Sequence, residues 1–357
     1  MIETACWNRQ TVGRFSMDFV TSDGAHLSYE RHGPAKGAPT VVLLHGWSLD
    51  RRVWSWQVDA LGDVAVVAYD ARGHGRSGPV TRTTATLGRL ADDLAEVLGA
   101  VTPTDRVVLV GHSLGGMTII EYAHRHPAHF AEHVCGVVLV STTAEGALHT
   151  TYGFSPALAP AVRAGELAGC WLLAHVGHLR PHWMPRQLLR RSVRWLAFGA
   201  PAQIEDLNLV TSIVARTSLR TIGAFGAAVD THRRLAELAA LPQIPVTVLV
   251  GARDRLTPLA CATNIAAAVP QAHLVVCPEG GHMLPLECRD EVNEALRLTI
   301  DRALTEMEHR GTRRSTDRNT DRATACDTAE TVARNVSRSM SGSDRHGHAR
   351  RTSTSGQ

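Results

Sequence analysis

The chain has 357 residues, of which 44% are hydrophobic and 20% are charged, a balance typical of a globular core. No apolar run approaches the roughly 20 residues that a spanning helix needs, so we expect no stable insertion into a membrane. Residues 1–7 lack a basic segment followed by an apolar one, which predicts no secretory signal. Seven cysteines without a Cys-x-x-Cys pair indicate reduced thiols in a cytoplasmic protein.

The formal net charge of +3 is concentrated at the C-terminal end of the chain. Residues 308–357 hold 10 arginines against 6 acidic residues, and they are rich in serine and threonine without apolar periodicity. This composition predicts a disordered basic tail over 307–357. Because its basic residues are interspersed with acidic ones, we expect no specific binding of nucleic acid.

In chain order, the first predicted element is a β-hairpin over 15–30 with a Ser-Asp-Gly turn. Leucine and valine at helical spacing predict a helix over 87–98, and a second helix follows residue 116 until Pro127 ends it. Apolar runs predict buried strands at 41–44, 64–69, 106–110, 137–140, 246–250 and 274–276. Such runs, alternating with helices, indicate an α/β fold with a mostly parallel sheet covered by helices on both faces.

The interval between about 141 and 245 contains no clear strand, and its helical pattern is broken by several prolines. We predict a helical cap inserted over 146–220, followed by a return helix to about residue 240. The core then comprises residues 15–145 and 221–306. Because ligands bind at the carboxyl edge of open α/β sheets, the cap is expected to cover the site.

Ser113 is the candidate nucleophile, within Gly-His-Ser-Leu-Gly-Gly over 111–116. The motif follows an apolar strand and precedes a helical pattern, which is the setting of a nucleophile elbow. Such a turn leaves the serine strained with its hydroxyl exposed, and Cβ atoms on either side would clash. A tight turn with an inert hydroxyl is the alternative.

A serine hydroxyl is a poor nucleophile at neutral pH and needs a general base that an acid orients. Asp254 follows the strand at 246–250, and His282 follows the last predicted strand, so all three loops should leave one edge of the sheet. Glu145, after the preceding strand, is the rival acid. The alternatives are a helix-capping role for Asp254 and a surface loop for His282.

Residues of about 15–305 resemble a capped serine hydrolase of the α/β-hydrolase superfamily, through the segments 45–47, 70–77, 111–115, 251–254 and 281–282. The resemblance implies that Ser113 attacks an acyl carbon, that His282 takes and returns its proton, and that Asp254 holds the imidazole. It also implies an oxyanion hole formed by the backbone N–H groups of Trp47 and Leu114. Nothing in the sequence requires a metal or an organic cofactor.

The expected substrate is a small apolar acyl ester, cleaved through an acyl-enzyme by an esterase or lipase-like enzyme. This expectation rests on the resemblance and on a cap rich in Leu, Ala and Trp. Carbon–carbon bond hydrolysis, thioester hydrolysis and cofactor-free perhydrolysis use the same triad and stay open. A non-catalytic ligand-binding protein of the same fold is the alternative from another class.

Three further patterns are interpreted as structural. The segment 70–77 resembles a family loop that glycines and a buried Asp–Arg arrangement hold beside the elbow, with His45 as a second anchor. Residues 129–133 match a His-x-x-Glu-His zinc motif, but Pro127 and the strand that follows leave room only for a short turn.

On 186–196, arginines and apolar residues fall on opposite sides of a helix. We expect its apolar side to pack on the sheet, with a basic face for anionic lipid, acyl carrier or coenzyme A thioester as the alternative.

Overall fold

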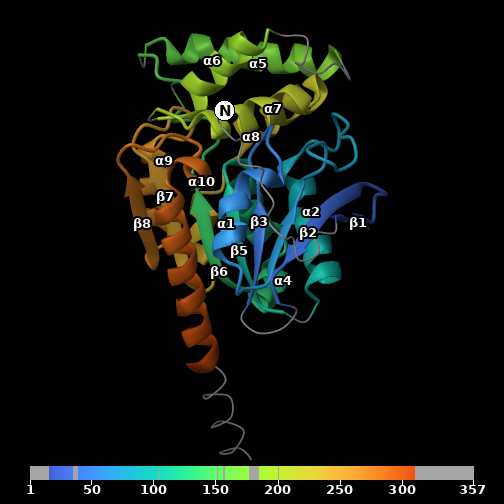
Figure 1. Cartoon of the computed structure of the whole chain (residues 1–357), viewed down its shortest axis with the longest axis vertical. Coiled ribbons are helices and arrows are strands. Elements are labelled where there is room, and N and C mark those ends of the chain that lie inside the picture. The colour runs from blue at the N-terminus through green and yellow to red at the C-terminus, as the bar shows by residue number, and fades with distance from the viewer. Residues whose placement is uncertain are drawn as a thin grey trace, which may run out of the picture. The chain divides into compact units, whose positions relative to one another are not determined.

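The computed structural model describes residues 16–34, 39–103, 105–150, 152–155, 157–176, 185–199 and 201–309. The chain divides into two units, residues 1–304 and 305–357. The second unit is described only over 305–309, so the predicted tail beyond these residues lies outside the described part of the chain, as does Phe15. The following description concerns the first unit (Figure 1).

An eight-stranded sheet forms the centre of the first unit, in the order β1-β2-β4-β3-β5-β6-β7-β8. β1 and β2 form the predicted hairpin and are antiparallel to their neighbours, whereas the strand pairs from β4 to β8 are parallel. The strands are β1 (Ser16–Val20), β2 (His26–His32), β3 (Thr40–Leu44), β4 (Val66–Tyr69), β5 (Val107–His112), β6 (Val134–Val140), β7 (Val246–Gly251) and β8 (Ala272–Cys277). The prediction of a mostly parallel sheet is confirmed.

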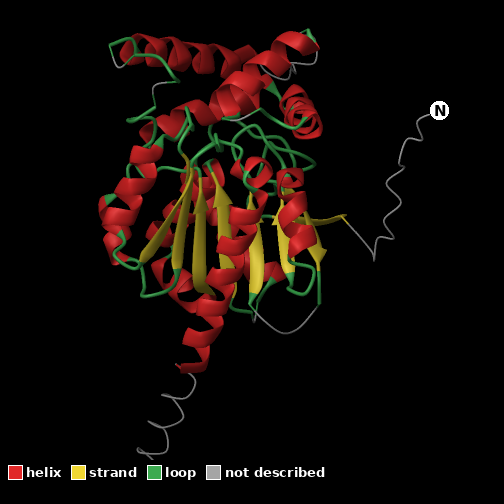
Figure 2. Ribbon diagram, turned by 60° about the vertical axis from the view of Figure 1, so that its left-hand side comes forward, coloured by secondary structure: helices red, strands yellow, loops and turns green. Residues whose placement is uncertain are grey.

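Helices cover both faces of this sheet (Figure 2). Every residue of β3 to β7 is buried, which explains why these strands are apolar runs rather than alternating patterns. The core helices are η1 (Arg51–Trp54), α1 (Ser55–Ala60), α2 (Leu87–Val101), α3 (Leu114–Arg125), α4 (Pro127–His133), η3 (Ala236–Ala240), α9 (Leu259–Ala268), α10 (Leu284–Glu287) and a helix over 289–309.

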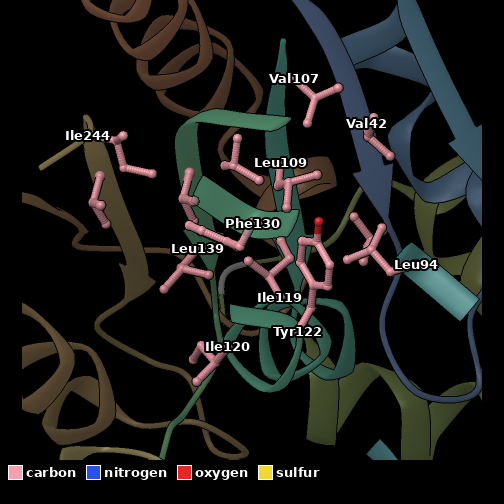
Figure 3. Packing of buried hydrophobic residues seen from close by; sticks show 14 of the residues in the cluster. Val42, Leu94, Val107, Leu109, Ile119, Ile120, Tyr122, Phe130, Leu139 and Ile244 are labelled. Atoms are coloured by element: carbon pink, nitrogen blue, oxygen red, sulfur yellow. The ribbon is translucent and has the colours of Figure 1, made fainter. Parts of the chain in front are cut away.

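The apolar core between the sheet and the helices α2, α3 and α4 fixes the position of β5 under α3 (Figure 3). Tyr122 and Phe130 pack with their ring centroids 5.6 Å apart, and both are buried beside Leu109 and Leu94. Burial of each such side chain stabilises the fold by about 1.5–3 kcal/mol. This packing holds rigidly the strand end and the helix start that flank residue 113.

Four helices lie above the carboxyl ends of the strands (Figure 1): α5 (Ala159–Val176), α6 (Arg186–Ala197), α7 (Ile204–Arg216) and α8 (Leu219–Thr231). The predicted cap boundary at 220 falls inside α8. This helix packs closely on α5, because an added Cβ on Gly223 would lie 2.3 Å from the backbone of Cys170 and Ala174.

The expectation that α6 packs its apolar side on the sheet is wrong. The helix contacts α7 instead, and only Leu189 and Val193 are buried. Leu188 and Trp195 are exposed. The physical reason is that Leu189 and Val193, four positions apart, lie on one side of the helix, while Leu188 and Trp195 lie on another side and do not share their contact.

Candidate active site

Ser113 occupies the turn between β5 and α3, with φ 53° and ψ −114°. An added Cβ on Gly111 would lie 2.5 Å from the backbone of the first turn of α3, and one on Gly115 would lie 2.4 Å from the carbonyl oxygen of Leu44. No side chain tolerates such contacts with backbone atoms. The predicted strand–turn–helix is therefore present, and its glycines are required by close packing.

Asp254 and His282 form a buried pair at the carboxyl edge of the sheet. Nδ1 of His282 donates to Oδ2 of Asp254 at 2.9 Å. Oδ1 of the same carboxylate accepts from the backbone N–H groups of Leu256 and Thr257 at 2.8 and 2.9 Å, and the Thr257 hydroxyl donates to Oδ2 at 2.8 Å. With the proton on Nδ1, the Nε2 atom of His282 is the ring's acceptor.

The environment of Asp254 favours its charged form. Burial by itself raises the pKa of this carboxyl, but the charge of His282 and the hydrogen bonds from His282 and Thr257 together lower the pKa below its ordinary value. The carboxylate is therefore ionised at neutral pH. An ionised acid beside the imidazole stabilises the imidazolium that forms when the ring accepts a proton.

The loop that carries His282 lies against the Ser113 turn. Nε2 of His112 donates to the carbonyl oxygen of His282 at 2.8 Å, and the two ring centroids are 4.9 Å apart. Burial lowers the pKa of His112 to about 3, so this ring is neutral at physiological pH. The structure thus brings the segments of Ser113 and His282 together at one edge of the sheet, with Asp254 hydrogen-bonded to the histidine.

The two residues predicted to donate to the oxyanion, Trp47 and Leu114, lie close to His112 and Ser113. An added Cβ on Gly46, the residue before Trp47, would lie 2.8 Å from Nδ1 of His112, and Leu114 is the first residue of α3. Among the described residues, the backbone N–H groups of Trp47 and Leu114 take part in no hydrogen bond. Within the described residues, both N–H groups therefore lack a backbone or side-chain acceptor.

The loop of Trp47 is held by the segment 70–77. Nε2 of His45 accepts from the backbone N–H of Ala71 at 2.9 Å, and Nε2 of His74 accepts from that of Ser48 at 3.1 Å. Burial lowers the pKa of His74 to about 3, which keeps its ring neutral and able to accept. The structural role expected for His45 and for this segment agrees with these contacts.

The buried Asp–Arg arrangement expected in the segment 70–77 takes its partners from elsewhere in the chain. Asp70 pairs with Arg51 at 2.5 Å, and Arg72 pairs with Asp93 at 2.5 Å. An added Cβ on Gly75 would lie 2.2 Å from the Asp70 carboxylate. The sequence pattern showed which residues are buried here, but the partners lie on η1 and α2, too far along the chain to be found from spacing.

The rival acid Glu145 is engaged away from His282. Its Oε2 atom accepts from the amide of Asn264 at 2.7 Å and lies 3.0 Å from Nε2 of His149. Asp254, rather than Glu145, is therefore the carboxylate placed on the candidate base.

Glu287 is a site residue that the sequence did not reveal. Its carboxylate accepts three backbone N–H groups, from Gly199 at 2.7 Å, Gly281 at 3.1 Å and Met283 at 2.9 Å. Two of these residues flank His282, so Glu287 fixes the backbone that positions the imidazole. No residue spacing signals this role, because the contacts are made to main-chain atoms and one partner is 88 positions away.

The zinc interpretation of residues 129–133 has no support. These residues all lie within the seven-residue helix α4, and the rings of His129 and His133 stack on each other with their centroids 4.0 Å apart. The described part of the chain contains no group of three or more side chains able to hold a metal ion. In the same residues, no helix is long and apolar enough to cross a membrane.

A cavity of about 720 Å³ opens between η1, the segment 70–77 and the junction of α7 and α8. Arginines line it, among them Arg52, Arg76 and Arg216, but Ser113 and His282 do not. It is therefore separate from the candidate catalytic residues.

Residues 41–295 match the model of the alpha/beta hydrolase family, and the chain belongs to this family. It is 30% identical over 252 residues to the protein named "Putative carbamate hydrolase RutD" of Enterobacter cloacae subsp. cloacae, covering 70% of this chain and 86% of that protein.

Two solved structures share the fold. A hydrolase from Pseudomonas aeruginosa PA01 is 26% identical with a TM-score of 0.60, covering 79% of this chain and 96% of that one. A thermophilic esterase from Thermogutta terrifontis is 22% identical with a TM-score of 0.63, covering 82% of this chain and 99% of that one.

Proposed function

We propose that this α/β hydrolase is a serine hydrolase that cleaves carboxylic esters of small or medium-chain apolar acids through an acyl-enzyme. The observation that carries the proposal is the buried hydrogen bond between Asp254 and His282, whose loop lies against the strained Ser113 turn. A base, its orienting acid and a partly exposed turn serine are the parts that acyl transfer to a hydroxyl requires.

Each residue has a defined part in the proposed reaction. Nε2 of His282 takes the hydroxyl proton of Ser113 as its oxygen attacks the acyl carbon, and Asp254 stabilises the imidazolium. The backbone N–H groups of Trp47 and Leu114 bind the oxyanion of the tetrahedral intermediate, each worth about 3 kcal/mol in the transition state. The imidazolium then protonates the leaving alkoxide, and water repeats the attack to release the acid and regenerate the serine.

Carbamate hydrolysis is the second candidate, favoured by the 30% identical relative that bears that name. A carbamate differs from an ester by a nitrogen on the acyl carbon, so the same nucleophile, base and oxyanion donors serve both reactions. The nitrogen donates electrons to the carbonyl and makes the acyl-enzyme slower to hydrolyse. Substrate choice therefore depends on the acyl pocket.

The test is a panel of p-nitrophenyl esters of acetate, butyrate and octanoate, run beside a p-nitrophenyl carbamate and a thioester with the full chain. We expect the highest kcat/KM with an ester and a loss of at least about 10³-fold in Ser113→Ala. Ser22→Ala, at the hairpin turn, is the matched control and should keep full activity. A higher kcat/KM for the carbamate would select the second candidate, and ester turnover unchanged in Ser113→Ala would refute both.

A further inference from the structure

Two buried cysteines stand at the two ends of the loop that carries His282. Cys277 is the last residue of β8, and Cys288 directly follows α10. They are 1% and 9% exposed. α10 lies at the carboxyl edge of the sheet, below the cap helices (Figure 1). Any change in how these two cysteines pack therefore acts on a loop of the candidate active site.

The side chains of the two cysteines are in contact. A Cβ added on Gly280 would lie 2.9 Å from Sγ of Cys288 and 3.2 Å from Cβ of Cys277, so both side chains converge on one point of the loop. The Cys288 thiol donates a hydrogen bond to the Cys277 sulfur. A disulfide requires a distance of about 2.05 Å between sulfur atoms. Thiols that are already hydrogen-bonded need only a small further approach to reach it.

This hydrogen bond makes Cys277 more reactive than other buried cysteines of the chain. Donation from Cys288 lowers the pKa of the Cys277 thiol, although burial and two nearby carboxylates oppose the change. Burial instead raises the pKa of Cys170 and of Cys261 to about 11. Because the thiolate is the form that attacks an oxidant, Cys277 is the thiol expected to react first.

The pair lies just beneath the surface, although both side chains are buried. Pro278 and Glu279, the two residues that follow Cys277, are exposed. Hydrogen peroxide is small and uncharged, so it needs little opening of this segment to reach the sulfur. It is therefore the oxidant that suits the pair.

We propose that Cys277 and Cys288 form a redox pair that hydrogen peroxide closes into a disulfide, and that this disulfide reversibly lowers catalysis by His282. The Cys277 thiolate attacks one peroxide oxygen, the O–O bond breaks, and a sulfenic acid forms as hydroxide leaves. The Cys288 sulfur then attacks the sulfenic sulfur, the S–S bond forms, and water leaves. In total the two thiols lose two protons and two electrons, and the peroxide is reduced to two molecules of water.

The disulfide acts on the candidate base through Glu287, the residue next to Cys288. The Glu287 carboxylate holds the two backbone N–H groups that flank His282. Since the sulfur atoms must approach each other to bond, the backbone at Cys288 and its neighbour moves toward Cys277. A displacement of about 1 Å can lower a rate about a hundredfold. This consequence for turnover rests on the proposed function, whereas formation of the disulfide does not.

The experiment is treatment of the full chain with hydrogen peroxide, followed by denaturation, alkylation of the remaining thiols and peptide mapping. Trypsin together with a glutamate-specific protease separates the two cysteines, because Glu279 and Glu287 lie between them. We expect a disulfide that links the peptides of Cys277 and Cys288 and that dithiothreitol removes. In the same samples kcat for an ester should fall at least about tenfold with little change in KM, and should return with dithiothreitol.

Matched variants remove one sulfur at a time. Cys277→Ser and Cys288→Ser keep a small polar side chain but cannot form the bond, so peroxide should leave the kcat of both unchanged. Cys261→Ser removes a cysteine that is buried on α9, and it should be oxidised and inhibited like the unaltered chain. Inhibition that persists in Cys277→Ser, or that dithiothreitol does not reverse, would indicate damage elsewhere, for example at Met283, and would overturn the proposal.

Mapping of the disulfide does not depend on turnover, so the two proposals can fail separately. A folded chain in which Cys277 and Cys288 both remain alkylated after peroxide treatment would overturn the redox pair, whatever its activity. A disulfide that forms without any change in kcat would overturn its control of His282. An untreated chain that hydrolyses no ester would instead refute the proposed function.

Discussion

The backbone N–H of His282 donates to the carbonyl oxygen of Ala197, the last residue of α6, at 2.9 Å. The same end of α6 is held from the other side of the site, because the guanidinium of Arg255, next to Asp254, donates to the carbonyl of Trp195 and lies 5.4 Å from its ring centroid. The cap is thus tied directly to the loops of both the candidate base and its acid. These contacts join the C-terminal end of α6 to the backbone of His282 and to the side chain of Arg255.

Glu287 tests whether the backbone around His282 must be fixed. In Glu287→Gln, an amide N–H₂ group replaces one carboxylate oxygen and cannot accept from a backbone N–H. We expect kcat to fall about a hundredfold with little change in KM, because a small displacement of a catalytic group has an effect of this size. Steady-state ester kinetics measure it.

The control is Glu291→Gln, an exposed glutamate on the following helix, which should leave kcat unchanged. A merely structural role for Glu287 predicts a lower melting temperature with normal kcat in the folded fraction. That result would remove Glu287 from the site.

Gly115→Ala tests the steric argument for the elbow. The added methyl group would meet the carbonyl oxygen of Leu44 at 2.4 Å, so we expect a loss of about 3 kcal/mol in the free energy of unfolding. Gly99→Ala in α2 adds the same methyl group where no atom lies within 4 Å. It should leave stability unchanged or raise it by up to about 1 kcal/mol. Urea denaturation compares the two, and equal effects would contradict the close packing described.

The buried ring of His112 should make the free energy of unfolding depend on pH. Its pKa is about 3 in the folded chain because of burial, against an ordinary value of 6.5. The unfolded chain therefore binds more protons below pH 6.5, and stability is lost as pH falls from 6.5 toward 3. At pH 5 this costs about 2 kcal/mol. His112→Gln keeps an N–H donor and does not titrate, so its stability should change less between pH 7 and 5. An identical slope in denaturant titrations would contradict this account.

Substitution of Asp254 and of Glu145 should have opposite effects if Asp254 is the acid that orients His282. Asp254→Asn should lower kcat by about 10⁴-fold, because the imidazole loses the partner that holds its tautomer. Glu145→Gln should keep near-normal kcat, since its contacts are with Asn264 and His149. Steady-state kinetics of both variants, measured over the same range of ester concentrations, separate the two residues. The reverse result would transfer the role of acid to Glu145.

Much of the fold could be predicted because it depends on short stretches of the sequence. The buried strands are continuous apolar runs, and the elbow depends on glycines whose side chains would collide with backbone atoms. Asp254 and His282 could be found because parallel strands end at the same edge of a sheet. The Asp254–His282 contact of 2.9 Å follows from this topology.

What could not be predicted depends on contacts between distant segments. Glu287 acts on main-chain N–H groups, which leave no mark in a side-chain pattern. Arg51 meets Asp70 only after η1 folds beside the sheet. The apolar side of α6 was assigned to the sheet because periodicity shows that a helix is amphipathic without showing its partner. In the structure Leu188 and Trp195 are exposed.

The central claim is that Ser113 is an activated nucleophile, and reaction of the folded full chain with a fluorophosphonate tests it most directly. We expect one adduct per chain in the intact mass, located on Ser113 by peptide mapping, absent in Ser113→Ala and strongly slowed when His282 is replaced by alanine. A folded chain that stays unlabelled, or an adduct on another serine that persists in Ser113→Ala, would contradict the account.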